Sequence, residues 1–378
     1  MRLLSTAVLF LTAAATSASA FTTIGNNHLK KPGGGITINT RSNQPPQSPC
    51  STKIVLKTAG GHSDEGSNDS SIATATIPNE IFNLVKSIIG AGVLSLPAGI
   101  AAMGNAPSAV IPATLLITIM GIISAYTFSM IARVCKYTGA TSYSDAWDKT
   151  RGTKISWLIA ASSALDCFSG NLSYSMVLAD TFRDLFSAVG ISPLATRSNA
   201  LLAITATVLF PLCLTKNLSS LAPFSLLGIM GMAYTSIAIA IRYFGGTYAL
   251  PAGKFLADLT PDLQPSFGSI GASGALSSQS LILICMLSTA YIAHFNAPKF
   301  FRELKNNTVN RFNIVTASSF GISIFIYAAV SAMGFLTFGA NSSGLILNNY
   351  STKDVLFSFS RFAVALSLVF SCVQQYFH

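Results

Sequence analysis

Residues 83–97 read NLVKSIIGAGVLSLP, and Gly90 and Gly92 interrupt an apolar run that is long enough to span a bilayer. Each glycine weakens a helix by about 1 kcal/mol relative to alanine. Because lipid offers no hydrogen bonds, loosened backbone is stable there only where protein or a water-filled cavity satisfies its N–H and C=O groups. The interruption therefore predicts a broken membrane helix with a ligand-binding site at the break, an arrangement that secondary transporters use.

The composition of the whole chain also indicates a membrane protein. Its 378 residues are 51% hydrophobic and only 10% charged, whereas a soluble domain carries about 25% charged residues. We predict about eight apolar spans of roughly 20 residues, and each should be a helix because open strands cannot cross lipid. The predicted spans are residues 81–103, 108–134, 155–181, 200–214, 221–243, 276–297, 312–338 and 355–372.

The net charge of +10 does not indicate nucleic-acid binding. The basic residues are scattered or lie in short loops, and no aromatic side chains alternate with them. If the residues before the first span face the inner compartment, the inner loops carry about twice as many Lys and Arg residues as the outer loops, which favours that orientation. The six cysteines show no repeated spacing, which argues against a zinc site or a disulfide framework.

The first 76 residues are predicted to be a targeting sequence. Met1-Arg2 precedes an apolar stretch that is too short to span a membrane, and Ala18-Ser19-Ala20 has the small residues of a cleavage site. Residues 1–20 are therefore predicted to be a signal peptide. Residues 21–76 are rich in Ser, Thr, Asn and Gly and contain no acidic residue before Asp64. This composition is typical of a transit peptide, followed here by a disordered linker.

The two targeting segments, joined at ASA-Phe21, resemble the bipartite plastid presequence of heterokont algae. In those presequences a signal peptide precedes a transit peptide, and a Phe at the first mature position directs import. The resemblance implies a plastid envelope membrane as the destination. The alternative is a plain secretory signal with a disordered tail, which leads to the endomembrane system or the plasma membrane.

Five short segments resemble, in order, helices of the amino acid/auxin permease family. They are NLVK with GAGVLSLP, SYSMVLAD from residue 173, the stretch from residue 211 to 218, AHFNAP from residue 293, and GFLTFG from residue 334. The resemblance implies that residues 77–378 form an all-α, LeuT-type transporter domain, a five-plus-five inverted repeat whose helices 1 and 6 are broken at mid-membrane. That family has eleven helices, so helices 9 to 11 are expected to be missing from this chain.

The two broken helices are predicted to form a substrate site. The N-terminus of a half-helix carries partial positive charge that suits a carboxylate, while unwound carbonyls suit an ammonium or a metal cation. A free amino acid presents both charges. The resemblance implies that the backbone at the first break contacts the substrate, whereas the alternative for its glycines is close helix packing. The candidates at this break are Gly90, Ala91, Gly92 and Val93.

Polar residues on two other spans complete the substrate-binding candidates. Helix 6 is predicted to break near residues 287–290, where Ser288 and Thr289 enter an otherwise apolar run. The alternative for both hydroxyls is hydrogen bonding to the preceding helical turn. Tyr174 is predicted either to face the same site or to pack between helices.

Four further residues are candidates for ion coupling or gating, namely Asn83, Lys86, Asp166 and His294. Asn83 and Lys86 share a helix face that leads to Gly90. Lys86 either extends to the membrane interface or occupies the cation site of sodium-coupled relatives, which would favour proton coupling. Asp166 is an intramembrane carboxylate and hence a functional candidate, unless it makes a structural hydrogen bond. His294 either titrates near neutral pH or is a packing residue.

The leading hypothesis for function is a secondary active transporter that moves amino acids across a lipid bilayer, coupled to protons or alternatively to sodium ions. The alternative is a transporter-like sensor that binds an amino acid without moving it. Because the spans contain no His-Glu-x-x-His motif, no Gly-x-Ser-x-Gly motif and no paired catalytic aspartates, an enzyme is not expected. The sequence implies no cofactor and no resident metal.

Overall fold

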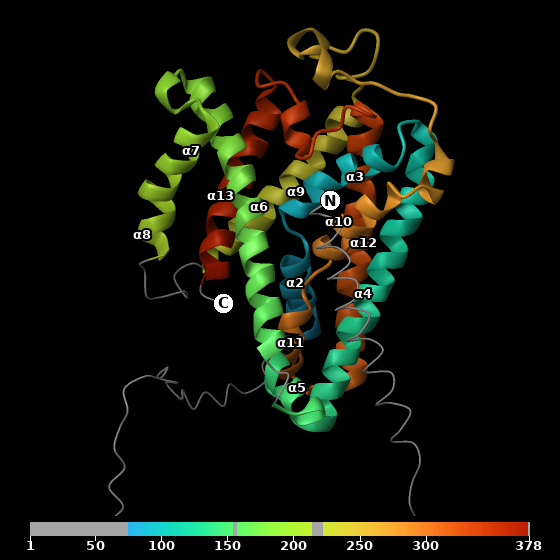
Figure 1. The fold of residues 1–378 in the computed structure, drawn as a ribbon, viewed down its shortest axis with the longest axis vertical. Coiled ribbons are helices and arrows are strands. Elements are labelled where there is room, and N and C mark those ends of the chain that lie inside the picture. Colours follow the sequence, from blue (N-terminus) through green and yellow to red (C-terminus); the bar gives the residue numbers. More distant parts are fainter. Residues whose placement is uncertain (1–74, 154–156, 214–221, 377–378) are drawn as a thin grey trace, which may run out of the picture. The chain divides into compact units, whose positions relative to one another are not determined.

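The computed structural model describes residues 75–153, 157–213 and 222–376. Almost all of the predicted targeting sequence, residues 1–76, lies outside the described residues. The described part is built of helices, which are joined by loops and by a longer connection between residues 245 and 279 (Figure 1). Helices occur in each of the predicted spans, so the expectation of an all-α protein is confirmed for the described part.

The α-helices run as follows in chain order. They are α2 Ile77–Ile88, α3 Leu96–Met103, α4 Val110–Thr138, α5 Tyr143–Arg151, α6 Trp157–Val189, α7 Arg197–Ile204, α8 Phe210–Cys213, α9 Ala222–Phe244, α10 Ser280–Ala290, α11 Ala297–Glu303, α12 Val309–Phe338 and α13 Val355–Tyr376.

Three stretches of the described residues are long and apolar enough to cross a membrane by length and composition: Pro107–Thr138, Ser280–Glu303 and Val309–Phe338. The bent pair α2 and α3 counts as a fourth if it forms one span. Shorter apolar helices occur in α7 to α8, α9 and α13. The predicted number of about eight spans, and the inverted repeat, stay predictions.

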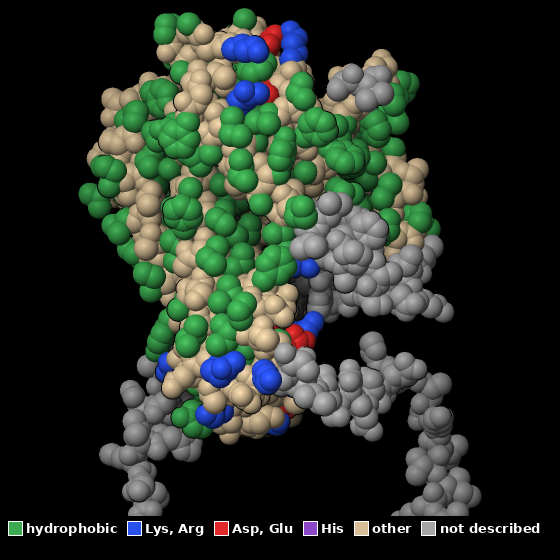
Figure 2. All heavy atoms as spheres, turned by 180° about the vertical axis from the view of Figure 1, so that it is seen from behind, with side chains coloured by type: hydrophobic (Ala, Val, Ile, Leu, Met, Phe, Trp, Pro, Cys, Tyr) green, Lys and Arg blue, Asp and Glu red, His purple; other side chains and the backbone are tan. Residues whose placement is uncertain are grey.

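The outer surface of the described bundle is apolar, as lipid contact requires. On α4, Ile111 and Leu115 are 74% and 59% exposed, and Phe325 of α12 is 74% exposed. Figure 2 shows hydrophobic side chains over the middle of one face, while the visible Lys and Arg side chains gather mainly towards its two ends. Such a distribution matches a hydrocarbon layer bounded by polar interfaces.

Helix α12 contacts α2, α3, α4 and α9 and is the common neighbour of the broken helix and the long span α4. Its buried face alternates aromatic side chains, such as Phe320, Tyr327 and Phe335, with small residues. The small residues allow close approach: a Cβ built on Gly334 would lie 2.7 Å from Cγ of Pro97 in α3. Helix α3 is therefore seated directly on the backbone of α12.

The first span is broken where the sequence predicts. Helix α2 ends at Ile88, Ile89 and Gly90 are extended, and a 3₁₀ turn, Ala91–Ser95, leads into α3. The two helical segments are bent by 46°. Neither Gly90 nor Gly92 has a positive φ, so the break does not require glycine for backbone strain. Their low helix propensity and small size are the properties that matter.

Replacing Gly334 by alanine is expected to destabilise the protein by about 1–3 kcal/mol, the usual range for overpacking a filled core. The added methyl meets the rigid ring of Pro97, which cannot rotate away. Thermal unfolding of the purified protein in detergent measures the effect.

The matched control is Gly321→Ala on the same helix, where a Cβ meets nothing within 4 Å. That variant should be unchanged or slightly more stable, because alanine favours a helix by up to about 1 kcal/mol. Equal unfolding temperatures for the two variants would show that α3 and α12 are not in close contact.

Candidate functional site

The two interrupted helices end at one side chain of α12. Tyr327 is fully buried, and its Oη lies 2.7 Å from the carbonyl oxygen of Ile88 and 2.8 Å from that of Ala290. Ile88 is the last residue of α2, and Ala290 is the last residue of α10. A hydroxyl has one proton, so Tyr327 donates to one carbonyl at a time. The ends of both half-helices are thereby held at the same point.

Tyr174 of α6 and the first break also lie close together. A Cβ on Gly90 would be 3.9 Å from Oη of Tyr174, and a Cβ on Gly92 would be 3.9 Å from Cα of Ala290. The structure therefore brings Tyr174, the first break and the end of α10 into one place. Val93 lies in the 3₁₀ turn that follows and is fully buried. The role of these residues in substrate binding stays a prediction.

The backbone at this place has groups of both polarities. The last carbonyls of α2 and α10 carry the partial negative charge of a helix C-terminus. The segment Ala91–Met103 starts at the same break, and the first N–H groups of a helix have no partner within it. Partial negative and partial positive backbone groups thus lie side by side in a part of the bundle surrounded by apolar helices.

The second break is displaced from its predicted position. We expected it near residues 287–290, but α10 continues to Ala290, and the non-helical residues are 291–293. A 3₁₀ turn, His294–Asn296, and α11 follow. The hydroxyl of Ser288 donates to Ile284 O at 2.9 Å, and that of Thr289 donates to Met286 O at 2.9 Å. These bonds let both polar residues remain helical. They are the bonds to the preceding turn that the sequence analysis gave as the alternative for these hydroxyls.

Two tyrosines at the breaks were missed by the sequence analysis. Tyr291 is the first residue of the second break, and its hydroxyl donates to Ile117 O of α4 at 3.2 Å. The centroids of the Tyr291 and Tyr327 rings lie 4.9 Å apart. A buried tyrosine in an apolar helix must find a hydrogen-bond partner, so the presence of both residues in apolar segments was a usable signal. Their partners are main-chain carbonyls far away in sequence, which no local pattern reveals.

The candidates for coupling are placed separately from one another. Asn83 and Lys86 both lie on α2, where Asn83 is exposed and Lys86 is half-buried. His294 is half-buried, and its Nε2 lies 2.8 Å from Oγ1 of Thr127 in α4. Asp166 belongs to α6, but its side chain lies outside the described residues.

One hydrogen bond that the sequence did not suggest joins α2 to the segment that follows the second break. The amide of Asn296 donates to Oγ of Ser87 at 3.1 Å. Within the part of the chain that the structure describes, no group of three or more His, Cys, Asp or Glu side chains could hold a metal ion.

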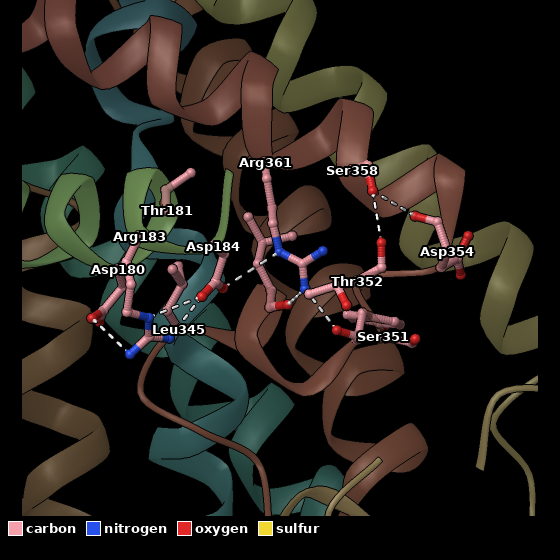
Figure 3. Close-up of polar contacts among 12 residues, drawn as sticks. Asp180, Thr181, Arg183, Asp184, Leu345, Ser351, Thr352, Asp354, Ser358 and Arg361 are labelled. Atoms are coloured by element: carbon pink, nitrogen blue, oxygen red, sulfur yellow. Dashed lines mark hydrogen bonds and ion pairs between the residues drawn. The ribbon is translucent and has the colours of Figure 1, made fainter. Parts of the chain in front are cut away.

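A second polar cluster lies near the start of α13, around Arg361 (Figure 3). Arg361 is 4% exposed, and its Nη2 donates to Leu347 O at 2.9 Å and to Tyr350 O at 2.6 Å. Asp184 of α6 lies 3.9 Å from its Nε and pairs with Arg183 at 2.8 Å. A buried guanidinium needs such partners, and here they fasten α13 to α6 and to the preceding loop.

Asp354, which is fully buried just before α13, continues this polar region. Its carboxylate accepts two bonds from Arg242 of α9, at 2.9 and 2.6 Å, and one from the hydroxyl of Tyr248 at 3.1 Å. Bidentate pairing of arginine and carboxylate fixes orientation as well as distance. The start of α13 is therefore fixed to α9 as well as to α6.

The bundle of apolar helices is typical of a membrane protein, and comparison with known families identifies its family. Residues 73–377 match the family described as transmembrane amino acid transporter protein. The match covers most of the chain, and the chain belongs to this family.

Three curated relatives are similar to the chain. A Danio rerio protein provisionally named sodium-coupled neutral amino acid transporter 11 is 27% identical over 78% of this chain and 62% of its own length. Vacuolar amino acid transporter 7 of Saccharomyces cerevisiae is 25% identical over 79% of this chain and 57% of its own length. Amino acid transporter AVT6E of Arabidopsis thaliana is 25% identical, with 74% of this chain and 55% of the relative covered. The chain thus spans roughly six tenths of the length of these relatives.

Replacing Tyr327 by phenylalanine is expected to lower stability by about 1–3 kcal/mol, because the one buried donor that the two helix-end carbonyls share is lost. Thermal unfolding in detergent measures this loss. The control is Tyr126→Phe, since Tyr126 is 59% exposed on α4. If the two variants unfold alike, Tyr327 does not hold the half-helices together.

Proposed function

We propose that the protein is a secondary active transporter that moves amino acids across a membrane by alternating access, driven by protons. The observation that carries this proposal is the meeting of two half-helix ends at Tyr327, beside the start of a third helical segment. Two interrupted spans that meet near mid-membrane are the usual site architecture of LeuT-type transporters. Membership of the amino acid transporter family and the names of the relatives support the same function.

The geometry suits the zwitterionic part of an amino acid. In the proposed complex the substrate carboxylate lies at the N–H groups of Ala91 and Gly92, where the helical segment begins, and Val93, whose N–H donates to Gly90 O at 3.3 Å, holds the turn beside it. The ammonium lies at the carbonyls of Ile88 and Ala290, which carry the opposite partial charge. Both charges of the substrate are then bound by backbone, so recognition does not depend on any one charged side chain.

The side-chain candidates have supporting roles in this proposal. The hydroxyl of Tyr174 is beside Gly90 and can donate to the carboxylate. Ser288 and Thr289 donate their protons within α10, but each hydroxyl retains acceptor capacity for an ammonium. Asn83, Lys86, Asp166 and His294 are proposed to act in coupling and gating rather than in substrate contact.

The test of function is counterflow in liposomes. The purified protein, reconstituted into vesicles preloaded with unlabelled amino acids, should accumulate the same amino acid in labelled form from outside. A sensor would bind the label without exchanging it. Absence of counterflow for all twenty amino acids, with binding retained, would assign the sensor function instead.

Gly90→Ala serves as the site variant in the same experiment. Its methyl has space in the protein, since the nearest atom is 3.9 Å away, but it occupies the path of the substrate to the backbone. We expect unchanged thermal stability and a half-saturation concentration about tenfold to a hundredfold higher, the usual effect of a mismatched methyl in a binding site. Gly321→Ala is the control, and equal kinetics for both variants would place the substrate elsewhere.

We also propose that the membrane in question is a plastid envelope, on the basis of the signal and transit segments in residues 1–76. A fluorescent protein fused after residue 76 should enter plastids when expressed in a heterokont alga. Phe21→Ala should leave the fusion outside the plastid, whereas Phe10→Ala, within the apolar stretch, should not. Secretion of the unaltered fusion would support the endomembrane or plasma-membrane alternative.

A further inference from the structure

Glu80 is a buried acidic residue that none of the contacts described above explains. It lies in the first turn of α2 and is 1% exposed, and neither of its carboxylate oxygens has a hydrogen-bond partner. An ionised carboxylate without donors is among the most costly groups to bury. In this conformation the group must therefore be neutral or must hold a positive ion.

The charged side chains that act on Glu80 do not supply the missing partner. They are Glu303 of α11, which repels a carboxylate, and Lys299 of α11, whose side chain is exposed to the surroundings. Arg311 of α12 is directed elsewhere and donates to Lys305 O at 3.2 Å.

The polar groups near Glu80 are likewise insufficient to stabilise its charge. On α12, Ser319 uses its hydroxyl on Ile81 O at 3.3 Å. The hydroxyl of Thr316, one turn earlier, is itself buried without a partner. The amide of Asn83, one turn further along α2, acts on Glu80, but no hydrogen bond of ordinary geometry joins the two. A carboxylate in these surroundings is stabilised by taking up a proton.

A proton fits this place better than a metal ion does. Calcium and magnesium ions require several oxygen ligands arranged around them, and among the described residues no group of three or more His, Cys, Asp or Glu side chains could hold a metal ion. A proton needs only one carboxylate oxygen and leaves a neutral group, which costs far less to bury.

The position of Glu80 connects its charge to the half-helices. Ala75, two residues before the start of α2, donates from its N–H to Glu303 O at 3.1 Å, and Lys305 donates from its N–H to Ala75 O at 2.9 Å. These two bonds join the start of α2 to the end of α11, the half-helices that lie on the same side of the two breaks (Figure 1). A negative charge on Glu80 would repel Glu303, whose own main chain forms this junction.

We propose that Glu80 is a proton-binding site, and that its protonation closes the junction between α2 and α11 while loss of the proton opens it. The driving proton of transport then binds at Glu80 rather than at the substrate site. This inference rests on the proposed transport function. Glu80 is then a coupling residue at the junction of α2 and α11. Its neighbour Glu303 influences how readily it loses the proton.

The test separates driven transport from exchange. In liposomes with an imposed pH gradient, Glu80→Gln should reduce amino acid accumulation by about tenfold or more, within the usual range of coupling between two sites. Counterflow at equal pH on both sides should remain, because exchange needs no net proton movement. Asp145→Asn is the control; it removes a carboxylate that is paired with Lys149 at 2.9 Å on α5, and it should retain both activities.

Infrared difference spectra of the purified protein provide a readout that does not depend on transport. Wild type minus Glu80→Gln should show the carbonyl band of a protonated carboxyl at neutral pH. In Glu303→Gln this band should disappear at a lower pH than in wild type, because the repelling charge is gone. Asp145→Asn should leave the band unchanged.

The outcomes distinguish the two proposals. Counterflow absent from wild type itself contradicts the transport function. Counterflow present, with accumulation by Glu80→Gln equal to wild type, overturns the assignment of Glu80. If Glu80→Gln loses both activities, the infrared band decides: its presence in wild type supports the proton site, and its absence at every pH from about 5 to about 9, the range in which buried carboxyl groups titrate, overturns it.

Discussion

The hydrogen bonds of Tyr327 to the carbonyls of Ile88 and Ala290 are the contacts on which the middle of the bundle depends. A helix interrupted in lipid leaves main-chain groups that water cannot reach, and each costs free energy unless protein satisfies it. One hydroxyl on the central helix α12 meets this need for one of the two interrupted helices at a time and can exchange between them. It also leaves one of the two carbonyls free at any moment, so the same constraint that stabilises the breaks leaves capacity for a cationic ligand.

Two other polar places in the described part of the bundle govern how the helices meet. Around the start of α13, Arg361 and Asp354 are buried and paired: Nη2 of Arg361 donates to two carbonyls, and the Asp354 carboxylate accepts two bonds from Arg242. At the junction of α2 and α11, Glu80 is buried and unengaged. Paired charges fix their helices in one arrangement, whereas an unpaired carboxyl changes its energy when it gains or loses a proton. The contacts at the start of α13 therefore suit a fixed arrangement of helices, whereas the junction of α2 and α11 suits an arrangement that responds to protonation.

Local sequence predicted the first break better than the second, for a physical reason. Two glycines within three residues weaken a helix whatever surrounds it, so the position of the first break can be read from residues 90–92. The second break has no such residues. Ser288 and Thr289 looked like its centre, but their hydroxyls bond within their own helix, and the chain leaves the helix only at Tyr291. There the side chain reaches Ile117 of α4, a partner that lies 174 positions away.

The sequence by itself determined that the chain is a bundle of apolar helices, that the first is broken at Gly90, and that the chain resembles amino acid transporters. These follow from composition, from helix propensity and from short motifs, all of which are local. Only the tertiary structure decided that Tyr327 joins both breaks, that Tyr174 lies beside Gly90, and that Glu80 is buried without a partner. Those facts depend on which helices pack together, and packing brings residues side by side that lie from 37 to 239 positions apart in the sequence.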